Sequence, residues 1–164
     1  MPNHYHLILK QVVEGGISLF MKKLGNSYTG YFNGKHERKG MGALFQGRFK
    51  IVHVDANDQF LHLVEYVFSN PVEIFDQDWK IKGVGNPKRA IEFLNEYKWS
   101  SYLDSIGIKN FPSVTQRDSL WKVFAGSADI EEAQSRVKKY TESWIKSKEI
   151  LHNNLASITK LSLD

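Results

Sequence analysis

The period of the apolar residues changes within the first third of the chain, and this change constrains the fold more than any other feature. Residues 3–10 place apolar side chains at every second position, which is the period of a β-strand. After Glu-Gly-Gly at 14–16, apolar residues recur every three or four positions from 17 to 33, which is typical of a helix. Residues 43–54 are rich in aromatic and β-branched side chains. They predict a second strand.

The remaining chain predicts mainly helices. The expected helical ranges are 59–70, 87–97, 117–125 and 129–146. Pro71 should end the first of these, because a proline disfavours helical geometry in the residue before it. Residues 76–87 predict a loop.

Positive charge is concentrated in one segment. The 164 residues carry a net charge of +4, yet residues 20–50 hold seven basic residues and one acidic residue, a net charge of +6. This distribution indicates a surface for phosphates, or alternatively a solvated lysine-rich face. Cysteine is absent, which permits a reducing cytoplasm and excludes disulfides and thiolate metal sites. No apolar run approaches the length of a membrane span.

Two residue pairs carry the candidate chemistry. His4 and His6 would project from one face of a strand, about 6–7 Å apart, close enough to share a metal ion or a phosphate. Tyr66 and Asn70 are four residues apart on a predicted helix and therefore share a face. Each pair also has a plain structural interpretation. The histidines would then be incidental surface residues, Tyr66 a core residue, and Asn70 a helix end.

The two pairs together suggest more than either pair alone. A phenol is a weak nucleophile with a pKa near 10. It can attack a phosphodiester when a divalent cation polarises the phosphate. Two imidazoles and one amide oxygen would leave open positions on such a cation. The covalent phosphotyrosine conserves the energy of the broken bond, so the same site can reseal DNA.

Four stretches in a fixed order resemble the REP-associated tyrosine transposases, which are single-tyrosine members of the HUH nucleases. The stretches are MPNHYHLIL, ALFQGRFK, EYVFSNPVE and YKWSSY, and the resemblance covers residues 1 to about 102. The first departs slightly from the His-hydrophobe-His motif, because the aromatic Tyr5 is its middle residue.

The resemblance implies an α+β fold, a ferredoxin-like antiparallel sheet with helices on one side. The transposase domain would span residues 1–104, and residues 105–164 would form a C-terminal helical extension. Met1 stands where the family has an internal methionine, so we expect the domain to lack its first strands.

The resemblance also implies roles for particular residues. Tyr66 would be the nucleophile that forms a 5′-phosphotyrosine, and His4, His6 and Asn70 would hold Mg²⁺ or Mn²⁺. The substrate would be single-stranded DNA beside a hairpin of a repeated extragenic palindrome. Family relatives include both monomers and homodimers, so both states stay open.

Further residues are candidates for DNA contact. Six polar or basic side chains would contact the DNA backbone, or else form a solvated edge: Gln46, Arg48, Lys50, Lys35, Arg38 and Lys39. Trp99 and Tyr102 would either stack on bases or pack in the core. Two other functions remain open: a DNA-binding module without catalysis, and a metal-dependent phosphodiesterase that activates water.

Overall fold

The computed structural model describes residues 4–38, 43–126 and 129–161. Helices make up 60% of the structure, and the described residues contain no β-strand. The chain divides into two compact units. One comprises residues 6–54, and the other comprises residues 55–164 together with residues 1–5.

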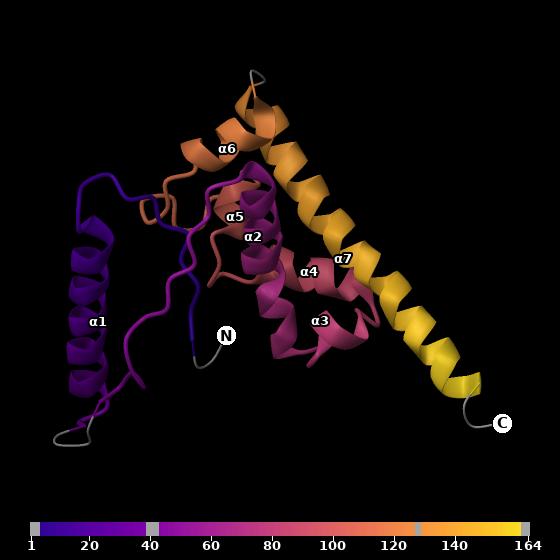
Figure 1. The fold of residues 1–164 in the computed structure, drawn as a ribbon, viewed down its shortest axis with the longest axis horizontal. Coiled ribbons are helices and arrows are strands. Elements are labelled where there is room, and N and C mark those ends of the chain that lie inside the picture. The colour runs from indigo at the N-terminus through magenta and orange to yellow at the C-terminus, as the bar shows by residue number, and fades with distance from the viewer. Residues whose placement is uncertain (1–3, 39–42, 127–128, 162–164) are drawn as a thin grey trace. The chain divides into compact units, whose positions relative to one another are not determined.

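The unit of residues 6–54 is built around one helix, α1 (Gly16–Lys35), drawn in indigo in Figure 1. This confirms the helix predicted over 17–33. The helix begins after Gly15, whose φ of 68° is left-handed and favours glycine. Aromatic contacts link α1 to the following segment, with the ring centroids of Tyr28 and Phe45 5.9 Å apart. No residue of α1 is buried, so this unit lacks a close-packed core among its described residues.

The predicted ferredoxin-like antiparallel sheet is wrong. The strands expected over residues 3–10 and 43–54 are absent, since residues 4–10 and 43–54 pair with no described segment and residue 3 lies outside the described residues. An alternating pattern suits a pleated surface, but a strand exists only where a neighbour pairs with its N–H and C=O groups. The alternate apolar residues Leu7 and Leu9 are correspondingly exposed. The predicted α+β class is therefore wrong, because helices are the only regular elements within the described ranges.

The other unit contains all the remaining helices of the described residues. Its elements are α2 (Asn57–Ser69), the 3₁₀-helix η1 (Asn70–Ile74), α3 (Trp79–Lys82), α4 (Pro87–Glu96), α5 (Tyr102–Ser105), α6 (Asp118–Ala125) and α7 (Ile130–Leu161). The four predicted helices are confirmed, although α7 continues well beyond residue 146. The predicted loop over 76–87 contains the short helix α3. The predicted domain division after residue 104 stays a prediction, and that position lies inside α5.

The long helix α7 organises the core of this unit. It packs against α2, α3, α4 and α6, as the orange-to-yellow ribbon in Figure 1 shows. Val137 and Ile145 are fully buried on α7, and they belong to one apolar cluster with Val64 of α2 and Leu94 of α4. Among the described residues, no helix is long and apolar enough to cross a membrane.

Two isoleucines test the importance of α7. Ile145→Ala should lower the free energy of unfolding by about 2–5 kcal/mol, because it removes a fully buried side chain from a packed cluster. Ile81→Ala is the matched control, since Ile81 is 74% exposed, and it should change stability by less than about 0.5 kcal/mol. Denaturant unfolding followed by circular dichroism measures both. Equal effects would contradict the packing described for α7.

Candidate functional site

Helix α2 holds Tyr66 and Asn70 one helical turn apart. Its buried residues Val64 and Phe68 belong to the core, which fixes the rotation of the helix. Tyr66 is 39% exposed, so solvent can reach it. Asn70 caps the C-terminus of α2 and is almost fully buried, and Pro71 follows it in η1. The predicted pair therefore lies together, at a helix end.

A lysine that the sequence analysis did not single out completes this group. Lys80 of α3 donates hydrogen bonds from Nζ to Oδ1 of Asn70 and, at 3.1 Å, to Oε2 of Glu73. The same ammonium lies 4.6 Å from the centroid of the Tyr66 ring. We call Tyr66, Asn70, Glu73 and Lys80 the Tyr66 cluster. Trp79, the neighbour of Lys80, is buried in the core and anchors α3.

Within the Tyr66 cluster, the Asn70 amide oxygen already accepts a hydrogen bond from a cation, the Lys80 ammonium. This oxygen is the predicted metal ligand, and the Lys80 ammonium takes the position beside it. The other amide atom, Nδ2 of Asn70, is buried and has no hydrogen-bond partner among the described residues. A metal ion coordinated by Oδ1 would have to displace or share with the ammonium. Asn70 thus offers an oxygen that could coordinate a metal ion, but the Lys80 ammonium competes for that oxygen.

The predicted histidine ligands are divided between the two units. His4 is grouped with residues 55–164, and His6 with residues up to 54. Their convergence with Asn70 therefore stays a prediction. Within the described ranges, no three His, Cys, Asp or Glu side chains gather to hold a metal ion. The predicted ligands, two histidines and one asparagine, are not a group of this kind, because the third ligand is an amide.

The environment of Tyr102 differs sharply from that of Tyr66. Tyr102 is only 1% exposed and packs edge-on against Phe68, with ring centroids 5.6 Å apart. Burial, together with the negative charge of Glu142, raises the pKa of Tyr102 to about 12. A buried phenol that resists ionisation is poorly suited to attack DNA or to stack on a base. Tyr102 is a core residue.

The predicted DNA-contacting residues lie in the unit of residues 6–54. Gln46, Arg48 and Lys50 are all exposed in the irregular segment that follows α1. Lys35, in the last turn of α1, donates to the Tyr31 hydroxyl at 3.3 Å, and the Arg38 guanidinium lies over the Phe32 ring. Lys39 lies outside the described residues. Lys35 is exposed as well, whereas Arg38 is half-buried.

Sequence reasoning missed Lys80 and Glu73. Glu73 lies three residues after Asn70 in η1, and Lys80 comes from a range that was expected to be a loop. The signal was weak. In the sequence, only the large apolar side chain of Trp79 indicates that this stretch packs against the core, and the structure buries it.

A histidine without an assigned role also has a partner. Nδ1 of His62 lies 2.9 Å from Oε2 of Glu65, a buried carboxylate on α2. Burial and the neighbouring Glu65, by its charge and a hydrogen bond, raise the pKa of Tyr140 on α7 to about 12. These polar residues join α2 to α7 on the side of Glu65.

Comparison with known proteins adds no relative. No family model, curated protein or solved structure matches the chain. The resemblance to the REP-associated tyrosine transposases therefore rests on the four sequence stretches alone.

The raised pKa of Tyr102 predicts an alkaline loss of stability. The folded state favours the neutral phenol, so this contribution is fully present below the unfolded pKa of about 10. It should be lost as the pH rises through about 12. Denaturant midpoints across this window measure the effect. The Tyr102→Phe side chain cannot ionise, so stability should fall less steeply with pH in this variant. Part of the fall should remain, because the pKa of Tyr140 is also raised. An unchanged fall in Tyr102→Phe would contradict the assignment.

Proposed function

We propose that this protein cuts and rejoins single-stranded DNA beside hairpins, with Tyr66 as the nucleophile. The observation that supports this most is the Tyr66 cluster, in which a solvent-accessible phenol has a cation beside it at the end of α2. The cation would offset the negative charge of an incoming phosphodiester. The order of the four sequence stretches supports the same conclusion.

The proposed reaction transfers one phosphoryl group. The Tyr66 oxygen bonds to phosphorus as the bond from phosphorus to the 3′ oxygen breaks. The phenolic proton is lost and the departing 3′ oxygen gains a proton, so the products are a 5′-phosphotyrosine and a free 3′-hydroxyl. Attack by a 3′-hydroxyl on the phosphotyrosine reverses these steps and reseals a strand.

A divalent cation belongs to this proposal. His4, His6 and Asn70 would hold Mg²⁺ or Mn²⁺, which would polarise the scissile phosphate. Imidazole ligands ordinarily favour softer ions than Mg²⁺, so the choice of metal follows the family resemblance. Lys80 competes for the Asn70 oxygen, and it would supply positive charge to the phosphate when the metal is not bound there.

DNA affinity would come largely from residues 20–50. Lys35, Arg38, Lys39, Gln46, Arg48 and Lys50 would contact the backbone without reading its sequence. Such binding weakens steeply with added salt, because bound phosphates release their counterions. The cysteine-free composition suits action in a reducing cytoplasm.

A second candidate function is hairpin binding without catalysis. Two observations favour it: the Lys80 ammonium occupies the Asn70 oxygen, and no sheet forms among the described residues to carry the histidine pair. Such a module would bind DNA through the same basic residues and leave it uncut.

One assay on hairpin DNA tests the nucleophile. We expect labelled DNA with a single-stranded flank to form a covalent adduct with the protein in Mn²⁺, visible as a shifted band on a denaturing gel. Tyr66→Phe should abolish the adduct, since the attacking oxygen is gone, and leave DNA affinity nearly unchanged. Tyr28→Phe, at an exposed tyrosine of α1, is the control and should keep the adduct.

The outcomes of this assay separate the candidate functions. An adduct that persists in Tyr66→Phe rejects Tyr66 as the nucleophile. Binding without product supports the non-catalytic module. Free cleavage product without an adduct supports a phosphodiesterase that uses water.

Removing Lys80 tests the competition at Asn70. Lys80→Met should tighten Mn²⁺ binding, measured by calorimetry, because the Asn70 oxygen loses its bound ammonium. Lys82→Met is the matched control: Lys82 also belongs to α3 and pairs with Asp78 at 3.0 Å, away from Asn70. Asn70→Ala in the Lys80→Met background should cancel the gain. Equal Mn²⁺ affinity in wild type, Lys80→Met and Lys82→Met would remove Asn70 from the metal site.

A further inference from the structure

An exposed aromatic pair stands on the surface of the helical unit. The rings of Trp99 and Phe111 are stacked, with centroids 6.1 Å apart and planes inclined by 21°. Trp99 is 79% exposed and Phe111 is 44% exposed. Large apolar side chains exposed together on a folded unit mark sites of interaction more often than scattered single ones. Two aromatic rings stacked at a small angle are a specific form of such a surface.

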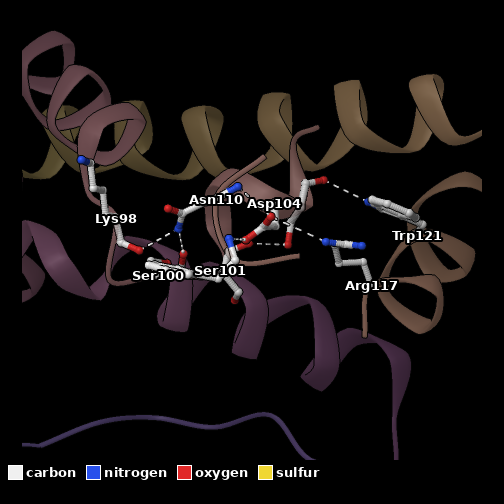
Figure 2. Close-up of polar contacts among 9 residues, drawn as sticks. Lys98, Ser100, Ser101, Asp104, Asn110, Arg117 and Trp121 are labelled. Atoms are coloured by element: carbon white, nitrogen blue, oxygen red, sulfur yellow. Dashed lines mark hydrogen bonds and ion pairs between the residues drawn. The ribbon is translucent and has the colours of Figure 1, made fainter. Parts of the chain in front are cut away.

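A polar network holds the two segments that carry these rings. Asp104 of α5 is buried and accepts hydrogen bonds from the backbone N–H groups of Asn110 (3.0 Å) and Phe111 (2.9 Å). The Asn110 side chain donates to the carbonyl oxygen of Lys98 at 2.7 Å. Figure 2 shows Asn110 between Lys98 and Asp104. The backbone beside Trp99 is thereby tied to the backbone of Phe111.

The network is anchored on the far side as well. Arg117 pairs with Asp104 at 3.6 Å, and Trp121 of α6 donates from its indole N–H to the Ser105 carbonyl oxygen at 3.0 Å (Figure 2). A buried carboxylate is costly unless it is paired and hydrogen-bonded, and here it is both. Because the supporting backbone is fixed before a ligand arrives, binding would cost little ordering of this loop.

The charges around the pair indicate what binds there. Four charged residues lie between positions 98 and 117: Lys98, Asp104, Lys109 and Arg117. Asp104 and Arg117 pair with each other, so the exposed charges of this segment are those of two lysines. Lys98 precedes Trp99 directly, and Lys109 precedes Asn110, whose side chain reaches the Lys98 backbone. Two exposed lysines that adjoin the segments of the aromatic pair in the sequence suit an unpaired base and its phosphates, and they repel cationic ligands.

We propose that Trp99 and Phe111 form a stacking platform for an unpaired base of single-stranded DNA, with Lys98 and Lys109 beside its phosphates. The choice of DNA rests on the proposed function, and the platform extends it by giving the single strand next to the hairpin a place on the helical unit. Stacking accepts any base, since every base has an aromatic face. None of the platform residues belongs to the Tyr66 cluster or to the basic residues between 20 and 50.

Binding of a short, labelled oligothymidine tests the platform. The full chain carrying Tyr66→Phe is the parent, so that no strand is cut, and fluorescence anisotropy measures affinity. Trp99→Ala should weaken binding about five-fold or more, as expected for the loss of one base–aromatic stack. Trp99→Phe should retain most of the affinity. Ile81→Ala is the matched control, an apolar side chain that is also largely exposed but has no aromatic face, and it should bind like the parent.

The lysines are tested by salt. Replacing Lys98 and Lys109 together with glutamine should reduce the slope of log affinity against log salt, because phosphate contacts are lost. Circular dichroism checks that each variant keeps its helices. An unchanged slope would overturn the assignment of the phosphates to these lysines.

Several results would overturn the platform itself. The platform is rejected if the parent does not bind oligothymidine, or if Trp99→Ala binds it as tightly as the parent does. It is also rejected if Ile81→Ala loses as much affinity as Trp99→Ala. A loss of self-association in Trp99→Ala with unchanged DNA affinity would reject it as well. The platform and the nucleophile can fail separately. Adduct formation by wild type with parent-like binding by Trp99→Ala rejects only the platform. The absence of any adduct, with weakened binding by Trp99→Ala, rejects only the strand-transfer proposal.

Discussion

The helical unit depends on the burial of one stripe of α7. Ala133, Val137, Thr141 and Ile145 follow one another at four-residue intervals and are all buried, so they form a continuous face that packs against the shorter helices. Thr141 brings a hydroxyl into this face and satisfies it locally, by donating to the Val137 carbonyl oxygen at 3.1 Å. Short helices such as α3 and α5 are not stable by themselves. Packing against this core is what maintains them.

This packing also determines the orientation of the candidate site. Because Val64 and Phe68 turn one side of α2 towards the core, Tyr66 on another side remains accessible. The burial of Trp79 fixes the start of α3 and so holds Lys80 near Asn70. The site therefore depends on apolar contacts outside it. A substitution that loosened α2 or α3 would alter the distance between the phenol and the ammonium without removing either group.

Helices were predictable from the sequence, and the absence of strands was not. The helix period at 17–33 and the residues around Pro71 are local signals, and the structure contains α1 and α2 close to the expected bounds. The alternation at 3–10 is equally local, but a strand needs a second strand, whose presence cannot be read from the alternation itself. The composition of residues 43–54 predicted a second strand and the family resemblance implied a sheet, but the described residues contain neither.

The candidate site shows the same division between local and long-range information. Tyr66 and Asn70 were predicted together, because four residues on one helix fix their geometry. Lys80 was missed, since its position depends on a turn between η1 and α3 and on the burial of Trp79. Asp104 was missed for a similar reason. Its partners Asn110 and Arg117 follow it by six and thirteen residues, through segments without a regular period.

The ammonium of Lys80 gives the site a property that a bare metal site lacks. An amide oxygen at a helix end binds a lysine or a metal ion by the same lone pairs, and only one cation can take the position directly in front of it. Glu73, as the second acceptor for Lys80, offers the ammonium an alternative partner 3.1 Å away. Lys80 can therefore yield the Asn70 oxygen without becoming an unpaired charge. A site arranged in this way keeps the ammonium beside the Tyr66 ring, and on the proposed function that ammonium would face the phosphate with or without a metal ion.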